Sequence, residues 1–203
     1  MVTIIIVIVT CIVSFGAFNS TRLMNRWIFD PYSIHHRKEY YRFITSGLLH
    51  GSWIHLIINM LVLYSFGTAV EEYYQEIFGT KGVLYFIILY IGGIVISDLP
   101  TYKKHQNDVI YKGLGASGAV SAVIFTSIVF QPLAKIYIWG VIGVPGIILG
   151  ILYLVYSAQM SKRSADNINH DAHFYGAVFG FLFTIAMRPS LLLHFINALI
   201  AWI

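Results

Sequence analysis

The stretch that decides the fold is GLGASGAVS at residues 113–121, which opens an apolar run that continues to Phe130. Ser117 stands between Gly115 and Gly118, where the pattern changes from loop to helix. A serine nucleophile needs an exposed hydroxyl and free backbone N–H groups, and the first turn of a helix supplies such groups. The same small residues also suit close packing between helices, so the motif by itself leaves both interpretations open.

Apolar runs of similar length recur along the whole chain. Hydrophobic residues make up 58% of the 203 residues and charged residues 11%, whereas soluble domains carry about 25% charged residues. A helix that crosses a bilayer needs about 20 mostly apolar residues. We therefore predict an all-α, polytopic membrane protein that forms one six-transmembrane-helix domain over residues 1–203. Its spans are expected at 2–18, 55–74, 82–97, 114–130, 136–157 and 172–187.

The polar residues concentrate in the connections between these spans. Residues 19–54 form a long, aromatic-rich first loop, which we expect to be folded and membrane-associated. Shorter polar loops are expected at 98–113 and 161–167. The apolar tail, 189–203, is too short to span the bilayer comfortably, so an interfacial helix is expected there.

The fifth expected span is unusual because it contains four glycines and Pro145 within residues 139–150. Proline removes one intrahelical hydrogen bond and clashes with the carbonyl four residues back, which predicts a kink near Ile142. One interpretation is a bending segment that admits a substrate helix sideways from the lipid, between the second and fifth spans. The other is close packing of small residues, which are frequent in membrane helices.

Several classes of function are disfavoured by what the chain contains. The single cysteine, Cys11, excludes a disulfide scaffold, and its apolar surroundings indicate a small buried hydrophobe. The net charge is +4, but no basic run is long enough for a nucleic-acid surface. The histidines are not spaced as metal ligands, so no metal site is expected. No internal repeat supports a transporter built from inverted repeats.

Two groups of polar residues fall inside expected spans, where such residues are functional candidates. His55 and Asn59 are four residues apart and share one helix face, just after His50. They could donate hydrogen bonds in a site or simply join neighbouring helices. Glu71, near the end of the same span, is either solvated or tied to a neighbouring helix.

The second group begins the sixth expected span with the sequence HDAH at residues 170–173. His173, Gly176 and Gly180 share one helix face, and the two glycines allow a neighbouring helix to approach closely. Packing against the small face of the fourth span would bring His173 near Ser117 as a general base. Asp171 points about 200° away from His173 on a helix, so a Ser–His dyad is predicted rather than a triad.

Taken together, these motifs resemble the rhomboid family of intramembrane serine proteases. The resemblance covers roughly residues 40–187 and rests on three motifs in the family's order. They are Arg42 with His50-x-x-x-x-His55-x-x-x-Asn59, Gly67 and Glu71; then Gly115-Ala116-Ser117-Gly118; and then Ala172-His173-x-x-Gly176-x-x-x-Gly180.

The resemblance implies a role for each matching residue. Ser117 would be the nucleophile and His173 the general base, while His55 and Asn59 would form an oxyanion hole with the Ser117 N–H. His50 would be a structural histidine, hydrogen-bonded within the first loop. The supporting positions would be Arg42, Glu71, Gly115, Gly118, Gly176 and Gly180.

The chain departs from the family pattern at three places. Ser121 stands where many bacterial members carry an aromatic residue that stacks on the base. The first loop has Tyr41-Arg42 where Trp-Arg is frequent, and His170 replaces a short polar residue. None of these changes removes a catalytic group.

The resemblance implies a cofactor-free intramembrane endopeptidase that cleaves single-span transmembrane proteins within the lipid bilayer. The alternatives are a non-proteolytic, client-binding relative and a small transporter. Ten Lys and Arg residues lie in the connections after spans one, three and five, and three lie on the opposite side. That count would place the first set in the cytoplasm. The family's topology instead places the active site near the outer face, and we expect a bacterial cytoplasmic membrane.

Overall fold

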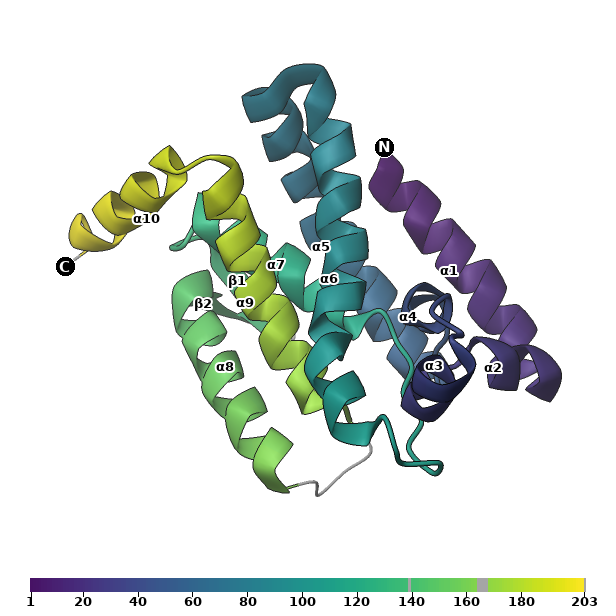
Figure 1. The fold of residues 1–203 in the computed structure, drawn as a ribbon. Helices are drawn as coiled ribbons and strands as arrows, with labels where there is room; N and C mark the ends of the chain where they lie inside the picture. The colour runs from purple at the N-terminus through teal and green to yellow at the C-terminus, as the bar shows by residue number, and fades with distance from the viewer. Residues whose placement is uncertain (139, 164–167, 203) are drawn as a thin grey trace.

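The computed structural model describes residues 1–138, 140–163 and 168–202 and is mostly helical (Figure 1). The long helices are α1 (Val2–Phe18), α5 (Trp53–Phe78), α6 (Gly82–His105), α7 (Ser117–Phe130), α8 (Gly146–Arg163) and α9 (His170–Met187). Shorter helices are α2 (Thr21–Trp27), α3 (Pro31–Arg37), α4 (Arg42–Thr45) and α10 (Ser190–Ile200), with 3-10 turns η1 (Ser46–Leu48) and η2 (Gly79–Lys81). Two strands, β1 (Lys135–Ile138) and β2 (Ile142–Pro145), form an antiparallel hairpin.

Length and composition mark one clear candidate for a membrane span, the helical stretch from Trp53 to His105. It contains α5, η2 and α6, which run back along each other (Figure 1). Helices α1 and α7 and most of α8 are apolar but shorter. Helix α9 passes the same test together with α10, to which it is bent by 114°. The sharp bend follows from Pro189, which has no N–H with which to continue the helix.

Helix α7 forms the centre of the bundle and is buried along most of its length. It packs closely on α9 because both helices carry small residues where they meet. A Cβ on Gly176 would collide with the Gly118 carbonyl oxygen, and one on Gly180 would collide with that of Ala122. The predicted contact between the small faces of the fourth and sixth apolar segments is therefore present.

The expected bounds of three segments need correction. Helix α7 begins at Ser117 rather than Leu114, because Gly115 has a φ of 119° that no right-handed helix adopts. The polar loop expected at 98–113 begins only after His105, because α6 continues through Pro100 to that residue. Ser97 and Thr101, one turn apart, are both buried and keep one face of this extension packed.

The largest correction concerns the fifth expected span, 136–157, because its helix begins only at Gly146. Strands β1 and β2 precede this helix and pair as an antiparallel hairpin, and Pro145 ends β2 immediately before α8 begins at Gly146. The predicted helix kink near Ile142 is therefore wrong. Gly140 adopts a φ of 71° in the turn, and Gly143 pairs with Tyr137 across the strands. Trp139 and residues 164–167, part of the expected 161–167 loop, lie outside the described residues.

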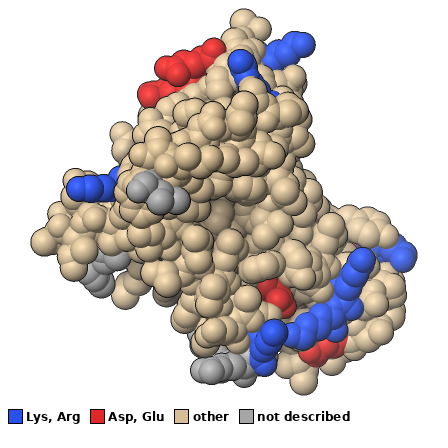
Figure 2. Space-filling model, turned by 90° about the vertical axis from the view of Figure 1, so that its left-hand side faces the viewer, with Lys and Arg blue, Asp and Glu red and all other residues tan. Residues whose placement is uncertain are grey.

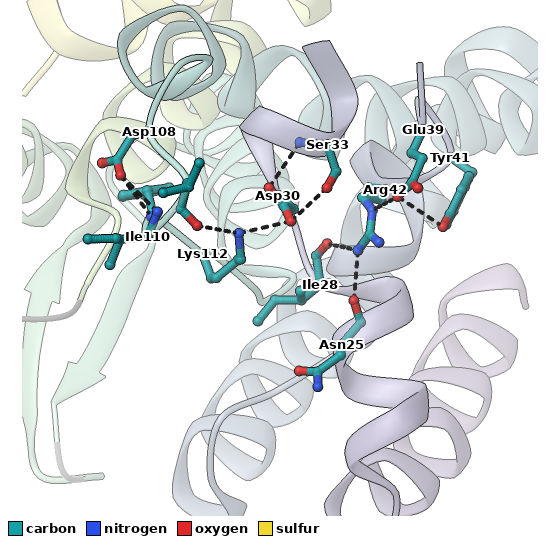
Figure 3. Close-up of polar contacts among 12 residues, drawn as sticks. Asn25, Ile28, Asp30, Ser33, Glu39, Tyr41, Arg42, Asp108, Ile110 and Lys112 are labelled. Carbon is teal, nitrogen blue, oxygen red and sulfur yellow. Dashed lines mark hydrogen bonds and ion pairs between the residues drawn. The ribbon is translucent and has the colours of Figure 1, made fainter. Parts of the chain in front are cut away.

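The connection between α1 and α5 contains helices α2 to α4. Phe29, Ile34 and Phe43 are buried together at its centre. Arg42 is buried and donates from Nη1 to the carbonyl oxygens of Asn25 and Ile28, each at 2.9 Å (Figure 3). Arg42 thereby fixes the end of α2 against α4.

Candidate active site

The turn before α7 places Ser117 at the wall of a cavity. Ala116 precedes the helix, and Ser117 is its first residue, half-buried and lining the cavity. The N–H groups of this first turn have no carbonyl partner within the helix. Gly115 is held by its N–H, which donates to the Ser46 carbonyl oxygen at 3.0 Å. The turn therefore presents a hydroxyl beside unpaired backbone donors.

Gly115 also brings the α5 polar face to the same turn. A Cβ on Gly115 would lie 2.9 Å from His55 Cε1, so the imidazole packs against a backbone that only glycine leaves open. Asn59 lies one turn further along α5, and its Nδ2 donates to the His55 carbonyl oxygen at 2.9 Å. One Nδ2–H of Asn59 remains outside that bond. Both side chains line the cavity with Ser117.

His173 reaches this cavity from α9, one turn before Gly176. The contact between Gly118 and Gly176 sets the separation of the two helices, because neither residue has a side chain to hold them apart. Ser117 directly precedes Gly118 on α7, and His173 lies one turn before Gly176 on α9. The structure thus brings the predicted nucleophile and base to one cavity.

An aromatic residue that the sequence analysis did not single out completes this wall. Tyr153 of α8 lies nearly parallel to His173, with ring centroids 6.0 Å apart and an interplanar angle of 21°. Its hydroxyl is 2.6 Å from Ser121 Oγ. Ser121 stands where many family members carry a stacking aromatic, and here the aromatic ring comes from another helix. The sequence signal for this contact was the small side chain at Ser121, which leaves room for an aromatic ring from another helix.

Asp171 lines the same cavity as Ser117 and His173 and bonds to α8. It accepts a hydrogen bond from Ser161 Oγ of α8. Asn169 caps α9 by accepting from the Ala172 N–H at 3.1 Å and from Thr101 Oγ1 of α6 at 3.0 Å. These contacts fix the start of α9, and hence His173, against both neighbouring helices. They agree with the prediction that Asp171 belongs to the first turn of the helix.

His50 is fully buried, and its ring meets edge-on, at 4.9 Å, the ring of His55, which lines the cavity. Ser14 Oγ of α1 donates to the Leu48 carbonyl oxygen at 2.8 Å and lies 3.0 Å from His50 Nδ1. A hydroxyl has one proton to donate, so His50 Nδ1–H is the donor in the second bond. The partner is therefore in α1 and not in the first loop, which corrects the prediction.

Burial, with the neighbouring His55 as a second cause, lowers the pKa of His50 to about 3. The imidazole is consequently neutral at any pH at which the protein would work. A neutral ring that donates from Nδ1 suits a structural histidine that holds the first loop against α1.

Two lysines are among the residues that line the cavity, which has a volume of about 1020 Å³. Lys104 and Lys112 both line it, and Lys112 Nζ pairs with Asp30 Oδ2 at 2.8 Å (Figure 3). Burial raises the pKa of Asp30, but the bonds from Lys112 and Ser33 outweigh it and hold that pKa below its ordinary value. Among the described residues, no three His, Cys, Asp or Glu side chains are grouped to hold a metal ion.

On one face of the molecule, charged and uncharged surface are separated. Figure 2 shows charged side chains gathered at the upper and lower ends of one face, with a broad uncharged zone between them apart from basic atoms at the left edge. Large apolar side chains are exposed on α1 and α5, among them Ile12, Ile54 and Leu61. An uncharged surface with exposed apolar side chains is typical of a protein that faces lipid.

These features define a class of protein: a helical membrane protein with a cavity among its helices that both polar and apolar side chains line. Comparison with known families is consistent with that class, because the Rhomboid domain matches residues 37–190. The chain therefore belongs to the rhomboid family, whose members are integral membrane proteins.

Individual relatives show the same likeness. The chain is 31% identical over 144 residues to the putative rhomboid protease YdcA of Bacillus subtilis, covering 71% of this chain and 65% of that protein. It is 30% identical over 149 residues to the mitochondrial RHOMBOID-like protein 12 of Arabidopsis thaliana, covering 66% and 42% respectively. The rhomboid protease GluP of Bacillus subtilis is 26% identical over 149 residues, covering 73% and 26%. The chain thus matches less than two thirds of the length of each of these relatives.

Proposed function

We propose that the protein is an intramembrane serine endopeptidase that cleaves single-span transmembrane proteins by a Ser117–His173 dyad. The observation that carries the proposal is the contact of Gly118 with Gly176, which brings the first turn of α7 and the His173 turn of α9 to one cavity. Membership of the rhomboid family, in which some relatives are named as proteases, supports it.

The proposed chemistry begins with the Ser117 hydroxyl, which attacks the carbonyl carbon of the scissile peptide bond. His173 accepts the hydroxyl proton and later delivers it to the leaving amine. The negative oxygen of the tetrahedral intermediate is stabilised by the Ser117 N–H and by donors from His55 and Asn59. Water, activated by His173, then hydrolyses the acyl-enzyme and releases the second product.

The proposed setting is a bundle of six spans in the lipid bilayer. Support comes from the apolar composition of α1, α5, α6, α7, α8 and α9 and from the uncharged zone on the face drawn in Figure 2. The cavity supplies the water that hydrolysis needs, and the family resemblance favours an active site near the outer face of a bacterial cytoplasmic membrane. The alternatives are a non-proteolytic, client-binding relative and a small transporter; retention of both Ser117 and His173 favours the protease.

The test is cleavage of a generic single-span substrate by the purified protein in detergent. Ser117→Ala and His173→Ala should each lower the rate by several orders of magnitude, and the double variant should be no slower, because the dyad acts as a unit. The matched controls are Ser127→Ala, on the same helix, and His36→Ala, which is exposed. These should retain the wild-type rate.

Two outcomes would contradict the proposal. Cleavage by Ser117→Ala at more than about a hundredth of the wild-type rate would exclude it as the nucleophile. Binding of the substrate without cleavage by the wild-type protein would favour the client-binding alternative. Asp171→Asn should leave the cleavage rate nearly unchanged. A loss of cleavage rate as large as that of His173→Ala would indicate a catalytic triad in place of the dyad.

A further inference from the structure

Tyr153 of α8 lies against His173 and is linked to Ser117 through Ser121. Its ring lies nearly parallel to the His173 ring, with the ring centroids 6.0 Å apart. Its hydroxyl lies 2.6 Å from Ser121 Oγ, and Ser121 Oγ in turn donates to the Ser117 carbonyl oxygen at 2.8 Å. Because Ser121 has one hydroxyl proton, the Tyr153 hydroxyl must be the donor to Ser121. A chain of two hydrogen bonds therefore links the Tyr153 ring to the residue that bears the nucleophile.

This arrangement limits the rotation of both the His173 imidazole and the Tyr153 ring. A histidine side chain has two rotatable bonds, and a flat ring against one face of the imidazole limits its rotation. The Tyr153 ring is itself held, by the Ser121 bond at one end and by Phe125 of α7, whose ring centroid is 6.1 Å away. The π-face of tyrosine also attracts the imidazolium that forms when the base accepts a proton.

Of the two tyrosines that α8 places against histidines of α9, Tyr153 is the one that lies against His173. Tyr156, one turn further on, is exposed and meets the His170 ring edge-on at 5.5 Å. Two tyrosines on the same helix thus contact two different histidines of α9, and Tyr153 is the one whose ring stacks on the proposed base. Its hydroxyl is also fixed to the nucleophile's helix.

We propose that Tyr153 is the positioning residue for His173, holding the imidazole toward Ser117 from a helix that carries no catalytic group. The inference rests on the proposed dyad. It also makes the dyad depend on the placement of α8, because the ring leaves His173 when α8 moves away from α9. Tyr153 acts through His173 and does not take part in bond making.

The test compares Tyr153→Leu, which removes the ring, with Tyr153→Phe, which keeps the ring and loses the hydroxyl. Two rates are measured in detergent: cleavage of a single-span substrate, and labelling of Ser117 by a small soluble fluorophosphonate. We expect Tyr153→Leu to lower kcat by about three- to tenfold, the effect of one aromatic contact, with KM little changed. Labelling should fall by a similar factor, and Tyr153→Phe should retain most of both rates.

Tyr156→Leu is the matched control, since it removes a tyrosine from the same helix one turn away. It should stay within about twofold of wild type, because an exposed side chain away from the reacting groups contributes little. Equal losses in Tyr153→Leu and Tyr156→Leu would overturn the proposal in favour of general packing of α8. If Tyr153→Leu does not fold, judged by size exclusion and thermal unfolding, Tyr153→Met supplies the same comparison with a flexible apolar chain.

The remaining outcomes separate this inference from the proposed function. Slower cleavage with unchanged labelling would mean that Tyr153 acts on substrate entry, which overturns its positioning role. Unchanged cleavage and labelling in Tyr153→Leu would also overturn it while leaving the dyad intact. Failure of the wild-type protein to label at Ser117 or to cleave would instead contradict the proposed function itself.

Discussion

At the scale of single residues, Gly115 determines where His55 lies. The positive φ of Gly115 turns the chain into α7, and its missing side chain leaves the space that the His55 imidazole occupies. Residues 60 positions apart in the sequence are therefore fixed against each other at the place where the oxyanion would form. A side chain at position 115 would be strained and would displace His55.

The first prediction concerns the two side-chain donors of the proposed oxyanion hole. His55→Ala and Asn59→Ala should each lower kcat without abolishing cleavage. A dominant oxyanion donor contributes about 10²–10³ in kcat, and three donors share the role here, so each loss should fall below that range. Steady-state cleavage in detergent measures it. If both variants cleaved at the wild-type rate, His55 and Asn59 would serve only to join neighbouring helices by hydrogen bonds.

The second prediction follows from the buried, neutral His50. Its pKa is about 3 in the folded protein and ordinarily 6.5, so between these values the unfolded chain binds a proton that the folded one does not. Stability is therefore full above about pH 6.5 and falls as the pH is lowered. At pH 5 this one group should cost about 2 kcal/mol.

Thermal unfolding in detergent at pH 7.5 and pH 5 tests this dependence on His50. His50→Gln should be less stable at pH 7.5 but should lose part of the acid destabilisation, because glutamine does not titrate. His36→Gln, at an exposed position, is the control and should keep the wild-type pH dependence. The same acid destabilisation in His50→Gln as in wild type would assign it to another group.

At the scale of elements, the close approach of α7 and α9 depends on small residues. The glycines at 176 and 180 meet the backbone carbonyls of α7 directly, so the helices are as close as their backbones allow. This closeness is what places the two proposed catalytic residues on one cavity wall. Bulkier residues would separate the helices before any catalytic group was altered.

The third prediction tests that closeness with Gly176→Ala. The added Cβ collides with the Gly118 carbonyl oxygen, which is backbone and cannot move away cheaply. We expect about 1–3 kcal/mol of destabilisation, typical of overpacking, together with a loss of cleavage. Gly16→Ala in α1 is the control, because its Cβ would meet its nearest neighbour, Leu23 Cδ2, at an ordinary 3.6 Å. Equal stability of both variants would show that α7 and α9 are not limited by backbone contact.

At the scale of the whole molecule, α1 is attached to the rest of the bundle near both of its ends. The Glu71 carboxylate of α5 accepts from the Val2 and Thr3 N–H groups at 2.7 and 2.9 Å, and from Thr3 Oγ1 at 2.8 Å. Near the other end, Ser14 bonds to Leu48 and His50. Glu71 thus ties its helix end to a neighbour, which is one of the two roles left open by the sequence.

The fourth prediction concerns this tie. Glu71→Ala leaves the first N–H groups of α1 without their acceptor, and we expect a loss of about 2 kcal/mol, as for removal of a charged helix cap. Glu72→Ala is the matched control, because Glu72 is the exposed neighbour on the same helix. Thermal unfolding of both variants in detergent measures the difference. A Glu71→Ala variant as stable as Glu72→Ala would mean that α1 does not depend on this cap.

The sequence by itself determined those features that local patterns carry: the rhomboid family, the mostly helical class, and the pairing of two small-residue faces. A run of apolar residues between glycines records helix length and close approach directly, so Ser117 and His173 could be singled out before the structure was known. The sequence did not distinguish a hairpin from a helix at residues 135–145, because a short apolar run fits both and hydropathy alone does not separate them.

Only the tertiary structure decided which residues support the candidate site from a distance. The bond between Ser121 and Tyr153 spans 32 residues, and that between Ser14 and His50 spans 36. Neither leaves a periodic signal, since each depends on how helices are placed side by side and not on the spacing within one helix. Tyr153 is one tyrosine among 14 in the sequence, and its contact with His173 exists because the hairpin starts α8 at Gly146 and sets which of its faces meets α9.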